Sequence, residues 1–190
     1  MAHASQGEPL RLHIGGEHAA PGWKIVNIDP ALPHVDFVGS ATDLSAFADA
    51  TVDEVYGSHI YEHLSYSTEL LQAFGEVHRV LKPGGVFKLG VPDLSVLCAL
   101  FLDPSLTREE QFYVMRMIYG GQTDAFDYHK GGYSFELMGE FMHAAGFRRI
   151  QKVDGFNLFP DTSNMTFRGM PISLNMQGVK PRPGEPEHAA

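Results

Sequence analysis

The chain has 190 residues, of which 44% are hydrophobic, enough for the core of one domain. Its net charge of −9 argues against general nucleic-acid binding, because that binding depends on neutralising phosphates. The single cysteine, Cys98, excludes an internal disulfide and a cysteine-based zinc cluster, and its apolar neighbours predict a buried thiol. We find no apolar run of the ~18 residues that a membrane span needs, and no signal peptide, so we expect a cytoplasmic protein without membrane contact.

The first third of the chain alternates short apolar segments with turns. Residues 1–9 are polar and we expect them to be flexible, ahead of one domain over residues 10–180. We expect strands at 10–14, 24–28, 35–38 and 53–56, with a loop or short helix at 41–48.

The remainder adds helical segments. Apolar residues at helical spacing predict a helix over 68–81, which Pro83 and Gly84 end. The composition of the tail at 181–190 predicts disorder. The alternation of strands and helices predicts an α/β fold, with a mostly parallel sheet and helices on both faces. Further strands are expected at 86–91, 147–153 and 172–179, further helices at 94–102, 108–119 and 135–145, and a glycine-rich loop at 120–132.

Small and acidic residues follow the first three expected strands. Gly15 and Gly16 follow the first, Asp29 the second and Asp43 the third. Glycine lets the backbone approach a ligand closely, and a carboxylate after the second strand can accept both hydroxyls of a ribose. Each feature read alone is also compatible with a plain turn. Together they favour an adenosine site at the carboxyl edge of the sheet.

Three segments resemble the class I S-adenosylmethionine-dependent methyltransferases, close to the compact methyltransferase 11-like family. They are VDEVYGSHIYEHL at 52–64, RVLKPGGVFKLGVPDL at 79–94, and residues 14–29, which begin with IGG and end with NID. The resemblance implies a Rossmann-like doubly wound sheet with an antiparallel last strand at 172–180. It also implies S-adenosyl-L-methionine as the cofactor.

The resemblance further implies how the cofactor is held. One departure is Glu17, which stands at the third position of the usual G-x-G and could repel the methionine carboxylate or pair with its amino group. By resemblance, Gly15 and Gly16 face the methionine part, Asp29 binds the ribose, Asp43 and Leu44 lie by the adenine, and Ser58 and His59 line the sulfonium end.

The loop at 120–133 is our candidate for the acceptor side. Its polar residues Gln122, Asp127 and Tyr133 suit hydrogen bonds to a polar acceptor, which we expect to be a small molecule or glycan methylated on oxygen. Methyl transfer to a hydroxyl requires removal of a proton, and a histidine titrates near neutrality. We therefore take His129 as the first candidate for the catalytic base, although a solvated loop histidine is the plainer interpretation. His63 and His59 are the second candidates.

Two other functions remain open. Glu17 and the short connection after the first strand favour a non-catalytic relative that binds a nucleoside or a partner protein. The run His59-Ile60-Tyr61-Glu62-His63 also matches the H-x-x-E-H pattern of zinc hydrolases, with Glu136 or Glu140 as a third ligand. By the resemblance this run needs no metal, and we expect none. A homodimer stays open.

Overall fold

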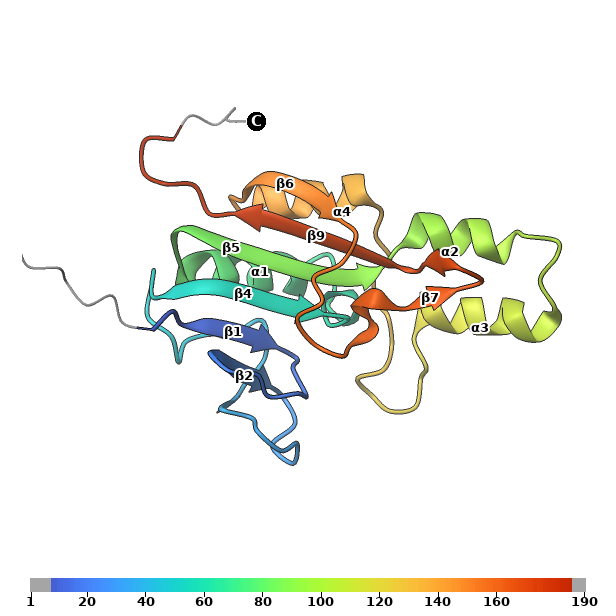
Figure 1. Ribbon diagram of the computed structural model, residues 1–190, viewed down its shortest axis with the longest axis horizontal. Helices are drawn as coiled ribbons and strands as arrows, with labels where there is room; N and C mark the ends of the chain where they lie inside the picture. The colour runs from blue at the N-terminus through green and yellow to red at the C-terminus, as the bar shows by residue number, and fades with distance from the viewer. Residues whose placement is uncertain (1–7, 186–190) are drawn as a thin grey trace, which may run out of the picture.

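The computed structural model describes residues 8–185, so most of the flexible N-terminus expected at 1–9, and half of the disordered tail expected at 181–190, lie outside the described residues. The main sheet has seven strands in the order β3-β2-β1-β4-β5-β9-β6 (Figure 1). No helix in this described range is long and apolar enough to cross a lipid bilayer. The strands are β1 (Arg11–Ile14), β2 (Trp23–Asn27), β3 (Phe37–Val38), β4 (Val52–Ser58), β5 (Leu81–Pro92), β6 (Arg148–Val153) and β9 (Ser173–Val179).

Strand pairing brings the carboxyl ends of β1, β2 and β4 to one edge of the sheet. Ile14 at the end of β1 pairs with Val26 on one side and Gly57 on the other, both in parallel register. Strand β9 runs antiparallel to both β5 and β6 and lies between them. The expected mostly parallel sheet with an antiparallel last strand is therefore confirmed.

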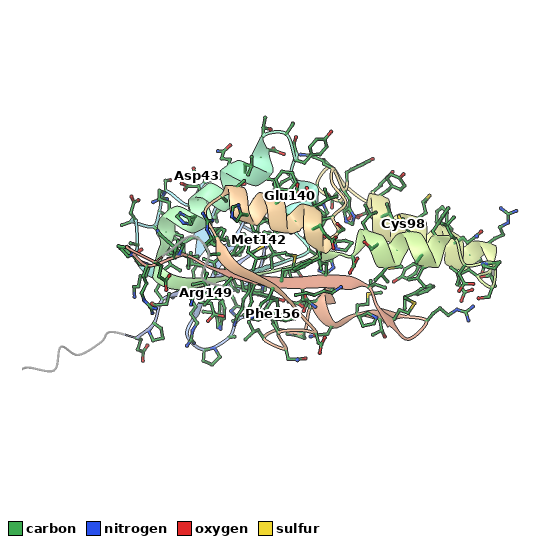
Figure 2. The ribbon with its side chains drawn as sticks, turned by 90° about the horizontal axis from the view of Figure 1, so that it is seen from above. Asp43, Cys98, Glu140, Met142, Arg149 and Phe156 are labelled. Carbon is green, nitrogen blue, oxygen red and sulfur yellow. The ribbon has the colours of Figure 1, made fainter. Side chains whose placement is uncertain are left out.

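One face of the sheet is covered by α1 (Glu69–Val80) and α4 (Phe135–Ala144), which pack together. Helix α1 buries Leu70, Phe74 and Val77, whose spacing puts them on one stripe of the helix. Helix α4 begins at Ser134, whose hydroxyl accepts a hydrogen bond from the Leu137 amide. Figure 2 shows α4 lying across this face above the strands.

The opposite face differs from our expectation of helices on both faces. The connection from Gly15 to Gly22 is too short for a helix of useful length, and none forms there. Residues 154–165, which follow β6, contribute aromatic side chains to this face. The Phe159 ring stacks on His13 at 3.9 Å between ring centroids and on Tyr56 at 5.5 Å.

Helices α2 (Leu94–Phe101) and α3 (Arg108–Tyr119) form an arm beyond the edge of the sheet (Figure 1). Their own small core includes Leu97, Leu100 and Val114. The prediction that Cys98 is buried is wrong, because α2 turns Leu97 and Leu100 toward α3 and leaves Cys98 exposed on its outer side (Figure 2).

Several short elements were not expected from the sequence. A 3-10 helix η1 (Tyr61–His63) follows β4, and η2 (Thr162–Asn164) leads into a hairpin of β7 (Thr166–Phe167) and β8 (Met170–Pro171). Strand β5 also starts five residues earlier than expected, because Leu81 pairs with Val52 across a register shift. Elements of two or three residues show no periodicity that a sequence pattern could indicate.

Candidate functional site

A cavity of about 950 Å³ opens at the carboxyl edge of β1, β2 and β4. Its walls come from the ends of these strands, from η1, from the loop at 120–132 and from residues 160–165. Cavities of this size hold small molecules and cofactors, and this edge is where open α/β sheets bind ligands.

The turn after β1 needs glycine for steric reasons. Gly15 has φ +73°, and a Cβ atom added there would overlap the side chain of Ile60. A Cβ atom on Gly16 would come within 2.5 Å of the His13 ring. The Gly15 amide donates to the Val26 carbonyl at 2.8 Å, and the Asn27 side chain donates to the Gly16 carbonyl at 3.1 Å. The structure thus brings the backbone of Gly15 to the wall of the cavity, whereas Gly16 is not part of the lining.

Glu17 lies beside this turn and lines the cavity, whereas Asp29 stands just outside the lining. Asp29 is exposed and accepts a hydrogen bond from the Ala31 amide at 2.8 Å, and its neighbour Ile28 lines the cavity. The Asp29 backbone amide also donates to Asn27 Oδ1 at 3.0 Å. This hydrogen bond fixes the side chain of Asn27 at the end of β2.

Asp43 and Leu44 do not line the cavity. Asp43 faces a shallow hollow on the surface that also includes Arg79, and hydrogen bonds from Ser45 lower the pKa of the Asp43 carboxyl. The Leu44 amide donates to Glu76 Oε2 at 2.8 Å. Ser40 and Ala41, earlier in the same turn, line the cavity in their place.

Ser58 and His59 both line the cavity, and hydrogen bonds determine the tautomer of His59. The Ser173 hydroxyl uses its one hydrogen to donate to the Thr162 carbonyl at 3.0 Å, so it accepts from His59 Nε2 at 3.2 Å. Nδ1 of His59 then carries no proton and accepts from the Ser58 hydroxyl at 3.0 Å. Burial lowers the pKa of His59 to about 4, so the ring is neutral at pH 7.

Asp161 and His13 line the same cavity and were not identified from the sequence. The Tyr56 hydroxyl donates to Asp161 Oδ2 at 2.6 Å, and the charge of Asp161 acts to raise the pKa values of His13 and His59. Burial outweighs this effect and lowers the pKa of His13 to about 4. Asp161 is more than one hundred residues from Tyr56 in the chain, so only the fold brings the two together.

The three residues expected to bind the acceptor do not line the cavity. Asp127 instead accepts from the Gly121 amide and the Thr123 hydroxyl, which closes the loop on itself. The backbone amide of Gln122 donates to the backbone carbonyl of Asp127. Tyr133 is buried, with 3% of its surface exposed. The loop residues that do line the cavity are Ala125, Phe126, Tyr128 and Lys130.

His63 lines the cavity, and His129 lies next to it with 4.8 Å between ring centroids but is not part of the lining. His129 Nδ1 is 3.2 Å from the Ile118 carbonyl, to which it donates. The Lys130 and Gly131 amides donate to the Glu62 carbonyl at 2.7 and 3.1 Å, which ties the loop to η1.

The zinc-hydrolase arrangement does not form. His59 precedes η1 with φ +54°, so it does not share a helical face with His63. Glu136 accepts from the Ser134 hydroxyl at the start of α4, and Glu140 lies further along that helix (Figure 2). A different group forms: ligand atoms of Glu62, His63 and His129 all lie within 4.8 Å of one another.

Comparison with known proteins agrees with this fold. Residues 20–89 match the Methyltransf_11 family, a methyltransferase domain. No curated protein sequence matches the chain significantly.

Solved structures show the same fold. A methyltransferase from Archaeoglobus fulgidus has a TM-score of 0.59 at 16% identity, over 92% of this chain and 87% of that one. A Thermotoga maritima methyltransferase, described as a possible histamine N-methyltransferase, has a TM-score of 0.58 at 17% identity, over 93% and 84%. A Nostoc punctiforme protein proposed to be an O-methyltransferase has a TM-score of 0.56 at 16% identity, over 92% and 52%. Residues 20–89 therefore match a methyltransferase domain, and the whole chain has the fold of the class I S-adenosylmethionine-dependent methyltransferases, a family whose cofactor is S-adenosyl-L-methionine.

Proposed function

We propose that this chain methylates an oxygen atom of a small molecule or glycan within the cavity at the carboxyl edge of the sheet. The observation that carries the proposal is the convergence of the Gly15 turn and the Ser58–His59 pair on one cavity. The first is a backbone surface for a cofactor, and the second is a polar pair with a neutral imidazole.

The residues present fit the cofactor. Gly15 lines the cavity and has no side chain of its own, so ligand atoms can approach its backbone from the cavity. We assign the methionine part to Gly15 and Glu17, whose carboxylate can pair with the cofactor's amino group. The ribose lies nearest Asp29 and Asn27 in this assignment, and the adenine lies by Ser40 and Ala41 rather than Asp43 and Leu44.

The chemistry requires little covalent work from the protein. S-adenosylmethionine supplies a methyl group on a sulfonium, so the carbon–sulfur bond breaks with its electrons going to sulfur as the new carbon–oxygen bond forms. The chain's part is to hold the acceptor oxygen in line and to receive its proton.

We assign the proton to Ser58 and His59. The Ser58 hydroxyl donates to the free Nδ1 of His59, so it can pass its proton on while it takes the proton of the acceptor hydroxyl. The negative charge of Asp161 favours the imidazolium that results. His129, the first candidate from the sequence, lies outside the lining and has one nitrogen bonded to the Ile118 carbonyl.

The acceptor side of the cavity combines aromatic and charged residues. Phe126 and Tyr128 are 71% and 48% exposed while they line the cavity, and Lys130 lies two residues further along. Aromatic rings with nearby polar groups suit the apolar faces and hydroxyl rims of a sugar or polyol. This composition supports a small polyhydroxylated acceptor.

The test is calorimetric titration with S-adenosylmethionine and S-adenosylhomocysteine, followed by turnover with a panel of sugars and phenols. We expect Asp29→Ala to weaken cofactor binding by roughly 1–3 kcal/mol, because ribose hydroxyls lose a partner. Asp43→Ala is the matched control, since Asp43 faces the separate hollow, and it should leave the affinity unchanged. Equal losses in both variants would refute the ribose assignment. Binding without turnover on any acceptor would favour a non-catalytic nucleoside binder.

A further inference from the structure

The group formed by Glu62, His63 and His129 is not explained by the proposed proton transfer. Glu62 is 1% exposed, and neither of its carboxylate oxygens has a hydrogen-bond partner among the described residues. A buried carboxylate without a partner costs several kcal/mol when it is ionised, so native structures pair such a group or bring it to a cation. Within residues 8–185, Nδ1 of His63 is also buried without a hydrogen-bond partner.

The two imidazoles complete a set of three ligands. His129 donates its Nδ1 hydrogen to the Ile118 carbonyl, which leaves Nε2 unprotonated and 4.0 Å from Glu62 Oε1. Histidines that bind metals usually donate their second ring nitrogen to a carbonyl or carboxylate in this way. At 4.0 Å the two atoms are too far apart for a hydrogen bond, but near the roughly 3.4 Å that separates ligands around a tetrahedral zinc ion.

Backbone hydrogen bonds also hold the group in place. The Glu62 carbonyl binds the Lys130 and Gly131 amides, which fixes η1 to the residues that follow His129. His63 lines the cavity, while Glu62 and His129 lie behind it. An ion held by the three side chains would therefore have its free coordination position toward the acceptor side.

We propose that Glu62, His63 and His129 bind a divalent transition-metal ion that coordinates the acceptor through a hydroxyl. Two imidazoles and a carboxylate favour Zn²⁺, Mn²⁺ or Fe²⁺ over Ca²⁺ or Mg²⁺, which take mainly oxygen ligands. The assignment of the acceptor rests on the proposed function, whereas the ion site rests on the three side chains alone. It departs from the expectation that this run needs no metal.

A bound cation would also explain how a base as weak as His59, whose pKa is about 4, could be sufficient for the reaction. Metal ions lower the pKa of a coordinated water or hydroxyl by many units, so a coordinated acceptor hydroxyl loses its proton near neutral pH. The Ser58–His59 pair then needs only to carry the proton away to solvent. An acceptor without a hydroxyl that can reach the ion should be a poor substrate.

The test measures binding of Zn²⁺ and Mn²⁺ to the full chain without an affinity tag, by calorimetry and by elemental analysis after dialysis. Co²⁺ serves as the spectroscopic probe, since its visible absorption reports ligand number and geometry. We expect one ion per chain, a Zn²⁺-dependent rise in Tm, and at least about 100-fold weaker binding in Glu62→Gln and His129→Gln. His143→Gln, an exposed histidine at the end of α4, is the control and should bind as the wild type does.

Stoichiometric binding that is unchanged in Glu62→Gln, or no binding at millimolar Zn²⁺ and Mn²⁺, would overturn the ion site. Both variants are expected to fold, because Glu62→Gln keeps the shape of the side chain and replaces a buried carboxyl group, whose pKa burial raises to about 8, by a neutral amide. Failure of this inference is distinct from failure of the proposed function. Methyl transfer that continues in the presence of a chelator disproves the ion's role only, whereas ion binding without methyl transfer on any acceptor disproves the methylation.

Discussion

The two sides of the cavity are built differently. On the strand side, Gly15, Ser58 and His59 are placed by the backbone of β1 and β4, and each position was expected from the sequence. On the loop side, the residues expected to face the acceptor, such as Asp127, bond to their own loop, and Phe126 and Tyr128 line the cavity instead. The contrast teaches that a side chain next to a strand end has a direction set by local geometry, whereas a loop side chain is directed by contacts along the whole loop.

The largest expected effect is on the strand side, at His59. We expect His59→Gln to lower kcat by about 10²–10⁴, the usual contribution of a general base, with little change in cofactor affinity. Because the pKa of His59 is near 4, its ring is already neutral above pH 5, and the wild-type rate should not fall between pH 7 and about 5. A pH profile of kcat measures this. An acid limb near pH 6.5 would point to a solvated histidine as the base instead.

The next effect concerns the backbone at Gly15. An alanine there would both hold an unfavourable positive φ and overlap Ile60, so we expect roughly 100-fold weaker cofactor binding or a comparable loss of stability. Gly169→Ala is a matched control, since Gly169 has φ +76° and no atom within 4 Å of an added Cβ. Calorimetry and thermal unfolding of the two variants separate the overlap from the strain. Similar losses in both would show that the close approach of Ile60 has no special role.

The smallest effect lies on the loop side. We expect Phe126→Ala to raise KM for the acceptor about tenfold, which corresponds to roughly 1.4 kcal/mol of lost stacking, with kcat nearly unchanged. Gln122→Ala should have no comparable effect. Gln122 holds the loop through its backbone amide, which the substitution keeps, and its side chain does not line the cavity. Steady-state kinetics on the same acceptor compare the two. A larger rise in KM for Gln122→Ala than for Phe126→Ala would instead support Gln122 as an acceptor-binding residue.

Much of the fold could be predicted because it depends on local patterns. Helix α3 was predicted at its observed bounds, and its start is explained by Thr107 and Glu110, which form a capping box. The parallel strands were placed within one to five residues, since apolar runs between turns are a local signal. The wrong prediction for Cys98 shows the limit: the apolar run indicated a helix, but only the position of α3 decides which side of that helix is buried.

The sequence by itself determined the α/β order of elements, the edge of the sheet at which the cavity opens, and the need for glycine at the first turn. These features follow from hydrophobic periodicity and backbone sterics over a few neighbouring residues. Only the tertiary structure decided that Asp161 comes to the cavity, that Asp29 stands just outside its lining, and that Glu62, His63 and His129 meet. These placements join segments up to more than one hundred residues apart, and their distances depend on strand order and loop closure, which no local pattern encodes.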